Sequence, residues 1–167
     1  RLATARELLR QADIAPGSLP PLLLGYSASQ TLRKVFLAIA SMWKAIGIRA
    51  DIQPLDGRAY GAALTESRFD AFSYAAFAQV PTAVVFLDRF VSGSAANVTF
   101  WRSAEFDRLF QAALRQREVA GRAAGMAAAE RVVLRELPVA PLWIGVSNRL
   151  VSPRVTGWVD HPGHAHP

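Results

Sequence analysis

Cysteine is missing from all 167 residues of the sequence, which excludes a disulfide framework, a CxxC redox pair and a thiolate metal site. Long apolar runs are also missing, and none approaches the roughly 18 residues that a membrane-spanning helix needs. Lysine is scarce, with 2 lysines beside 17 arginines. The arginines are scattered singly, so the net charge of +6 has no dense basic run behind it. Such scattered charge is typical of a solvated surface, and we predict no nucleic-acid partner.

Signatures of catalysis are absent as well. The sequence has no Gly-x-Ser-x-Gly motif, no phosphate-binding Walker loop and no dinucleotide fingerprint. Asp56, Asp70 and Asp88 lie near apolar runs, but the sequence pairs none of them with a second catalytic group. Helix caps and loop salt bridges are their more ordinary roles. We therefore predict that the protein is not an enzyme and needs no cofactor.

The three histidines, His161, His164 and His166, stand together near the end of the sequence. Neutral imidazoles are good nitrogen ligands for divalent metals. The intervening Pro, Gly and Ala offer no scaffold that would hold tetrahedral geometry, and no carboxylate follows. We predict no metal site here and a loose tail over residues 161–167.

The remaining composition is that of a globular domain. Hydrophobic residues make up 51% and charged residues 19% of the chain. Its length suits one domain, which we predict over residues 1–160. The sequence opens on a helical pattern without an export signal, so we expect it to be part of a longer chain.

Hydrophobic periodicity predicts a helix over 2–12, a buried strand over 22–26 and an amphipathic helix that Ser29 caps. That helix carries its apolar residues at three- and four-residue spacing and ends near Gly47, a residue tolerant of positive φ. Apolar and polar residues alternate over 48–53, which predicts a second strand with one solvent-exposed face. Strand, helix and strand in this order favour a βαβ crossover.

Further elements are expected along the rest of the chain. The first are a helix over 57–66, a strand over 69–77 and a short helix over 82–90. A helix capped by Ser103 follows, and then a second helix that Pro138 ends, with Met126, Ala129, Val133 and Leu137 inward. The last are a buried strand over 139–145 and an extended segment over 150–158. Together they predict an α/β fold with a mixed central sheet and helices on both faces.

Aromatic residues divide into two groups. Phe36, Trp43, Phe106 and Phe110 lie on helical core stripes, where packing explains them. The others fall at predicted strand ends or in loops, where α/β folds place ligands: Tyr26, Tyr74, Phe77 and Trp101. For these, binding and packing are both open.

Several short sequence motifs, taken in their order and spacing, resemble those of a known family over about residues 2–160. They include Leu22-Leu23-Leu24-Gly25-Tyr26, Ala40-Ser41-Met42-Trp43-Lys44-Ala45-Ile46-Gly47-Ile48, Arg68-Phe69-Asp70, Ser103-Ala104-Glu105-Phe106-Asp107, Leu137-Pro138-Val139-Ala140-Pro141-Leu142 and Val151-Ser152-Pro153-Arg154-Val155-Thr156-Gly157-Trp158. The chain resembles the C-terminal lobe of family 5 extracellular solute-binding proteins, the peptide- and nickel-binding components of ABC importers.

The resemblance implies one lobe of a periplasmic-binding-protein type II clamp that closes over a ligand. The implied function is capture of a peptide or similar solute outside the cell membrane, in the periplasm or extracellularly. The implied partners are the ligand, the missing lobe of the parent chain and an ABC permease in the membrane. A solute-sensing domain of a transcriptional regulator and a binder of a non-peptide solute such as a sugar stay open as alternatives.

The resemblance also implies ligand-binding positions. They lie in two segments. The first is the loop after the first strand, with Tyr26, Ser27, Ser29 and Gln30. The second is the segment after the Arg68-Phe69-Asp70 motif, with Ser73, Tyr74, Ala76, Phe77 and Gln79. Peptide binders of the family place an Asp in the second segment to pair with the α-amino group of the ligand. Here no acidic residue stands between Asp70 and Asp88. Because a buried ammonium without a counter-ion is costly, we expect this amine anchor to be absent or supplied by the other lobe.

Overall fold

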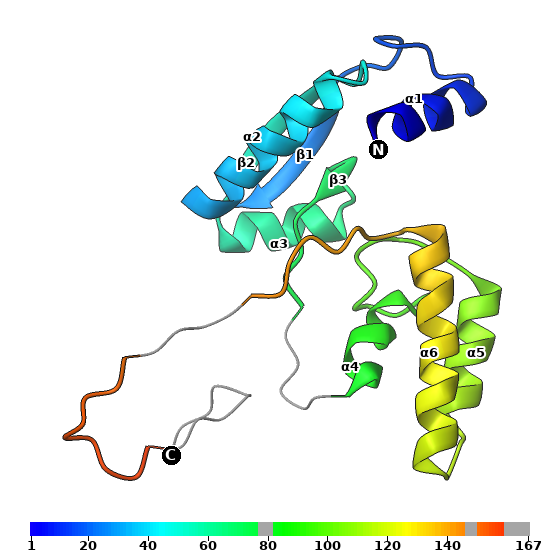
Figure 1. The fold of residues 1–167 in the computed structure, drawn as a ribbon, viewed down its shortest axis with the longest axis vertical. Coiled ribbons are helices and arrows are strands. Elements are labelled where there is room, and N and C mark those ends of the chain that lie inside the picture. The colour runs from blue at the N-terminus through cyan, green and yellow to red at the C-terminus, as the bar shows by residue number, and fades with distance from the viewer. Residues whose placement is uncertain (77–81, 146–149, 159–167) are drawn as a thin grey trace. The chain divides into compact units, whose positions relative to one another are not determined.

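The computed structural model describes residues 1–76, 82–145 and 150–158 (Figure 1). They belong to two compact units, Arg1–Ala75 and Ala76–Pro167. A single domain over 1–160 stays a prediction. The histidine cluster and the predicted loose tail over 161–167 lie outside the described residues.

The first unit is built on three parallel strands. They are β1 (Leu22–Ser27), β2 (Ala50–Leu55) and β3 (Ala71–Phe72), in the order β2-β1-β3. Between β1 and β2 runs α2 (Gln30–Lys44), so the predicted βαβ crossover is confirmed. The predicted first helix is confirmed as α1 (Leu2–Gln11), and Gly47 takes a φ of 86° just after α2.

Helices cover both faces of this sheet, as Figure 1 shows for α2 and for α3 (Gly57–Thr65). Strand side chains alternate between the faces. Leu24 and Tyr26 on one face pack with Phe36 of α2, and all three are at most 4% exposed. On the other face, a Cβ at Gly25 would lie 2.4 Å from the ring of Phe69, so only glycine leaves room for that ring. The predicted α/β class with helices on both faces is therefore confirmed.

The strand expected over 69–77 is much shorter than predicted. Only Ala71 and Phe72 pair with β1, opposite Leu24 and Gly25. The ladder continues for one further bond, from the Ser73 amide to the Gly25 carbonyl at 2.9 Å. The Ser73 carbonyl accepts its hydrogen bond from the Tyr60 side chain, which diverts that acceptor from strand pairing.

The second unit is helical in its described part. It contains α4 (Ala83–Leu87), a 3₁₀ turn η1 (Asp88–Phe90), α5 (Ala104–Leu114) and α6 (Val119–Glu136). Ser103 caps α5, as predicted. Phe106 and Phe110 are at most 1% exposed and form the centre of the core with residues of α4 and α6. The helices α5 and α6 approach closely, since a Cβ at Gly125 would lie 2.7 Å from the Ala113 Cβ.

Two predictions for the end of the chain are wrong. Leu137 is 64% exposed and left-handed, with a φ of 53°, because the following Pro138 disfavours the helical conformation at this position. Residues 139–145 form no strand, and Leu142, Trp143 and Ile144 are each at least 55% exposed. A strand needs a neighbour for its backbone groups, and the described part of the second unit, to which residues 139–145 belong, contains no strand to pair with. The described sheet is parallel, where a mixed central sheet was expected.

The segment 150–158, predicted to be extended, contains neither a helix nor a strand. It carries a turn in which the Val155 amide donates to the Ser152 carbonyl at 2.9 Å. Among the described helices, none is long and apolar enough to cross a membrane.

Candidate ligand-binding site

The carboxyl ends of β1 and β3 bring two serines to the same end of the sheet. This end, where the parallel strands finish, is called the edge of the sheet below. Ser27 is the last residue of β1, and Ser73 directly follows β3. Because β1 and β3 are parallel and paired at Gly25 and Phe72, both chains leave the sheet in the same direction. Ser27 and Ser73 are half-buried. Open α/β sheets bind ligands outside the carboxyl ends of their strands, so this edge is the candidate site.

The amino end of α2 lies next to β1 in the chain and adds two exposed polar residues, Ser29 and Gln30. The Ser29 hydroxyl accepts a hydrogen bond from the Leu32 amide at 3.2 Å, which confirms it as the predicted N-cap. The preceding Ala28 amide donates to the Leu55 carbonyl at 2.9 Å. This bond ties the loop between β1 and α2 to β2, so Ser29 and Gln30 are presented from an ordered turn.

Tyr26 is placed differently from its neighbours. Its side chain is 2% exposed, and its ring stacks on Phe36 with the ring centroids 5.1 Å apart. This position is on the α2 side of the sheet, inside the core. Of the two roles that the sequence left open for Tyr26, the structure supports packing.

The second predicted segment is described only in part. Tyr74 is 45% exposed, and Ala76 is also exposed and begins the second unit. Phe77 and Gln79 lie outside the described residues. The structure thus brings together Ser27 and Ser73 at one edge, with Ser29, Gln30 and Tyr74 on the chain segments that leave it.

Tyr60 is a residue of this edge that the sequence analysis missed. It lies on α3, is 8% exposed, and its hydroxyl contacts both the carbonyl and, at 3.2 Å, the hydroxyl of Ser73. Burial raises the pKa of Tyr60, while the hydrogen bonds to Ser73 partly oppose that rise. The sequence signal was weak, because Tyr60 shares its helical stripe with Ala63 and Leu64 and reads as a core residue.

Trp101, the remaining aromatic candidate, belongs to the core of the second unit. Its ring meets Phe106 edge-on at 5.3 Å between centroids, and its indole Nε1 donates to Glu136 Oε2 at 3.1 Å. Packing explains this residue.

Two of the three aspartates have ordinary structural roles. Asp56 caps α3 by accepting from the Ala59 amide at 3.2 Å. Asp70 accepts from the Leu23 amide at 2.7 Å, joining the start of β3 to β1. Asp88 begins η1. Among the described residues, no group of three His, Cys, Asp or Glu side chains is arranged to hold a metal ion.

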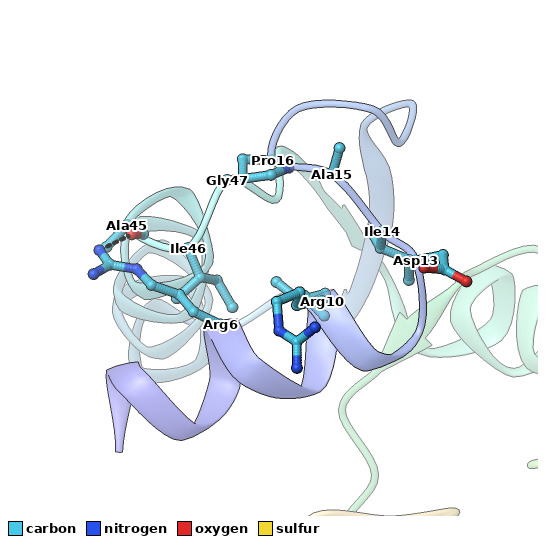
Figure 2. Close-up of a pocket in the computed structure, with 10 residues that line it drawn as sticks. Arg6, Arg10, Asp13, Ile14, Ala15, Pro16, Ala45, Ile46 and Gly47 are labelled. Atoms are coloured by element: carbon cyan, nitrogen blue, oxygen red, sulfur yellow. Dashed lines mark hydrogen bonds between the residues drawn. The ribbon is translucent and has the colours of Figure 1, made fainter.

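A hollow of about 660 Å³ opens elsewhere in the first unit, between α1, the loop after it and the end of α2 (Figure 2). Its lining includes Arg6, Ile14, Pro16 and Ile46. These segments precede β1 and β2, so the hollow lies toward the amino ends of the strands. Arg6 donates to the Ala45 carbonyl at 3.0 Å across it. The hollow is therefore distinct from the serine-bearing edge.

Comparison with known proteins finds relatives that are periplasmic binding proteins by name. The chain is 26% identical to the periplasmic murein peptide-binding protein MppA of Escherichia coli (strain K12) over 162 residues, 96% of this chain and 30% of MppA. It is 26% identical over 159 residues to the periplasmic oligopeptide-binding protein OppA of Haemophilus influenzae, 92% of this chain and 29% of OppA. The probable deoxycholate-binding periplasmic protein YgiS of Escherichia coli (strain K12) is also 26% identical, with the same coverage as MppA.

The fold is shared with MppA as well. The solved structure of MppA in its unliganded open form superposes with a TM-score of 0.76 at 25% identity, covering 82% of this chain and 27% of MppA. The chain thus spans about 30% of the length of these relatives. The model of bacterial extracellular solute-binding proteins, family 5 Middle, matches residues 1–98, which is more than half of the chain. The chain belongs to the bacterial extracellular solute-binding proteins of family 5.

Proposed function

We propose that residues 1–160 form one lobe of a two-lobed solute-capture protein, which binds a peptide and delivers it to an ABC permease. The protein would act in the periplasm or outside the cell, by binding and without chemistry. The observation that carries this proposal is the edge of the parallel sheet where Ser27 and Ser73 lie, in a chain whose relatives include a murein peptide-binding protein. The proposed contact residues are Ser27, Ser29, Gln30, Ser73, Tyr74 and Ala76, with Phe77 and Gln79 beyond the described part.

The chemistry of this edge suits the backbone of a peptide. Serine hydroxyls both donate and accept hydrogen bonds, and a glutamine amide does the same. An extended peptide presents N–H and C=O groups in alternation, so such neutral groups can hold it whatever its side chains are. Tyr26 does not contact the ligand in this proposal. Its ring stacks on Phe36 and so fixes β1, which carries Ser27, against α2.

The charge of the edge limits how the peptide terminus is held. The chain has no acidic residue between Asp70 and Asp88, and the Asp70 carboxylate is bonded to the Leu23 amide. Asp56, which follows β2 at the same end of the sheet, accepts from the Ala59 amide as the cap of α3. A free ammonium buried beside Ser73 would lack a counter-ion from its own segment, which is costly. The amino group of the peptide is therefore held by the other lobe or left in water. This edge of the sheet binds the neutral backbone groups of the ligand.

The test is native mass spectrometry of the full-length protein, purified gently so that bound ligand is retained. A heterogeneous set of small peptide masses supports the proposal. One sharp non-peptide mass contradicts the peptide part of it, and a bile acid would point to the chemistry that YgiS carries in its name.

Site variants then connect the ligand to the edge. Ser27→Ala and Ser73→Ala each remove one hydrogen-bonding hydroxyl, and we expect affinity to fall about fivefold per lost bond. Ser18→Ala is the matched control, since the Ser18 hydroxyl bonds to the Ala15 carbonyl near the amino ends of the strands. Equal affinity in all three variants would show that the ligand does not contact this edge.

A further inference from the structure

The contact between Tyr60 and Ser73 determines which hydrogen-bonding groups Ser73 offers. The Tyr60 hydroxyl lies against two atoms of Ser73, the carbonyl oxygen and the side-chain Oγ. A carbonyl only accepts, so the single hydrogen of the Tyr60 hydroxyl is donated to it. The Tyr60 oxygen can then only accept from Ser73 Oγ. The Ser73 hydroxyl hydrogen is consequently directed at Tyr60, and the lone pairs of Oγ are what remains for a ligand.

Tyr60 is held firmly in the position that this arrangement needs. Its ring lies against the ring of Phe69, with centroids 6.1 Å apart, and Phe69 occupies the space that Gly25 leaves on β1. The adjacent α3 residues Ala63 and Leu64 are buried as well. Burial raises the pKa of Tyr60, so the phenol keeps the hydrogen that it donates.

Ser73 is also fixed through its backbone. Its amide donates to the Gly25 carbonyl at 2.9 Å, while its carbonyl is occupied by Tyr60. With both backbone groups bonded within the protein, Oγ is the remaining polar atom of this half-buried residue that can accept from an outside donor. Its acceptor character follows from where its hydrogen points.

We propose that Tyr60 is a positioning residue that sets the Ser73 hydroxyl as a hydrogen-bond acceptor, so that this edge selects ligand N–H or O–H groups. A ligand carboxylate is disfavoured at this position, because it would place one acceptor against another and leave both without a donor. The inference rests on the proposed peptide-binding function. It assigns the ligand group that faces Ser73 as a donor, which in a peptide is a backbone amide.

The experiment measures binding of trialanine and its two singly N-methylated analogues to the full-length protein by calorimetry. An N-methyl group removes one backbone donor, and its added bulk and altered cis/trans preference are the same in every protein variant, so the comparison between variants isolates the lost donor. In the wild type, we expect one of the two analogues to bind about tenfold more weakly than trialanine. In Ser73→Ala, that ratio should fall to about threefold or less, because the acceptor is gone.

Tyr60→Phe separates positioning from packing. It keeps the ring against Phe69 and removes only the hydroxyl, so that the Ser73 hydroxyl can rotate and donate. In Tyr60→Phe the Ser73 hydroxyl can still accept but is no longer held as an acceptor, so we expect the N-methyl ratio to fall part of the way toward its value in Ser73→Ala, while Ser18→Ala keeps the wild-type ratio. A merely structural role for Tyr60 would weaken all three probes equally and leave the ratio unchanged.

The two levels of the proposal fail differently. If trialanine binds but Tyr60→Phe keeps the wild-type N-methyl ratio, whatever Ser73→Ala does, the inference about Tyr60 is overturned and peptide binding stands. If the wild type binds none of the three probes and native mass spectrometry shows no peptide, both are overturned.

Discussion

Adding one methyl group to β1, by the substitution Gly25→Ala, should destabilise the first unit through a single collision. The added Cβ would lie 2.4 Å from two carbons of the Phe69 ring and 2.5 Å from a third. Ordinary carbon contacts are about 3.5–4.0 Å, so the ring must move by about 1 Å or more. Phe69 is 8% exposed and lies against Tyr60, which leaves it little room to move.

The magnitude follows from two opposing effects. Overpacking a well-packed site costs about 1–3 kcal/mol. Replacing a glycine within a strand by alanine returns about 0.5–1 kcal/mol, because the unfolded chain of the variant has less freedom to lose. We therefore expect Gly25→Ala to lower the free energy of unfolding by about 1–2 kcal/mol, measured by urea denaturation followed by circular dichroism.

A double-mutant cycle tests the stated cause. Phe69→Ala alone should cost about 3–5 kcal/mol, as is usual for a buried phenylalanine. In Phe69→Ala the ring is gone, so adding Gly25→Ala should cost nothing more, and the two effects should not add. Additive losses, or a Gly25→Ala protein as stable as the wild type, would refute the collision between β1 and Phe69.

Three further predictions use single substitutions. Gly125→Ala places a Cβ 2.7 Å from the Cβ of Ala113 and should lower the free energy of unfolding in urea by about 1–3 kcal/mol. Gly61→Ala, where the added Cβ has nothing within 4 Å, should instead raise this free energy by about 0.5–1 kcal/mol. Ser29→Ala removes the N-cap of α2 and should cost about 1 kcal/mol; no change in the unfolding midpoint would contradict this role. The folded-state pKa of Tyr60 is raised above 10.0, so its contribution to stability is complete below pH 10 and is lost as the pH rises through the folded value. Tyr60→Phe should remove that part of the alkaline decline in stability, and an unchanged alkaline profile would contradict it.

Local patterns were sufficient for the elements whose causes lie within a few residues. The apolar stripe and the Ser29 cap define α2, and Gly47 takes the positive φ expected after it. The crossover between β1 and β2 followed from element order, because parallel strands need a long connection. The same kind of pattern predicted a strand over 139–145 and failed, since an apolar run reports a preference for burial and not the presence of a neighbour to pair with.

The sequence by itself determined the α/β class, the helix caps, the family and the serines that follow the strands. Only the tertiary structure decided which side chains meet at the sheet edge. Tyr26 and Ser27 are adjacent in the chain, yet one is buried against Phe36 and the other ends at the edge, because successive strand residues point to opposite faces. Tyr60 and Ser73 are 13 residues apart and carry no shared motif. Their hydrogen bonds exist because α3 packs on the face of β1 that Gly25 leaves open for Phe69.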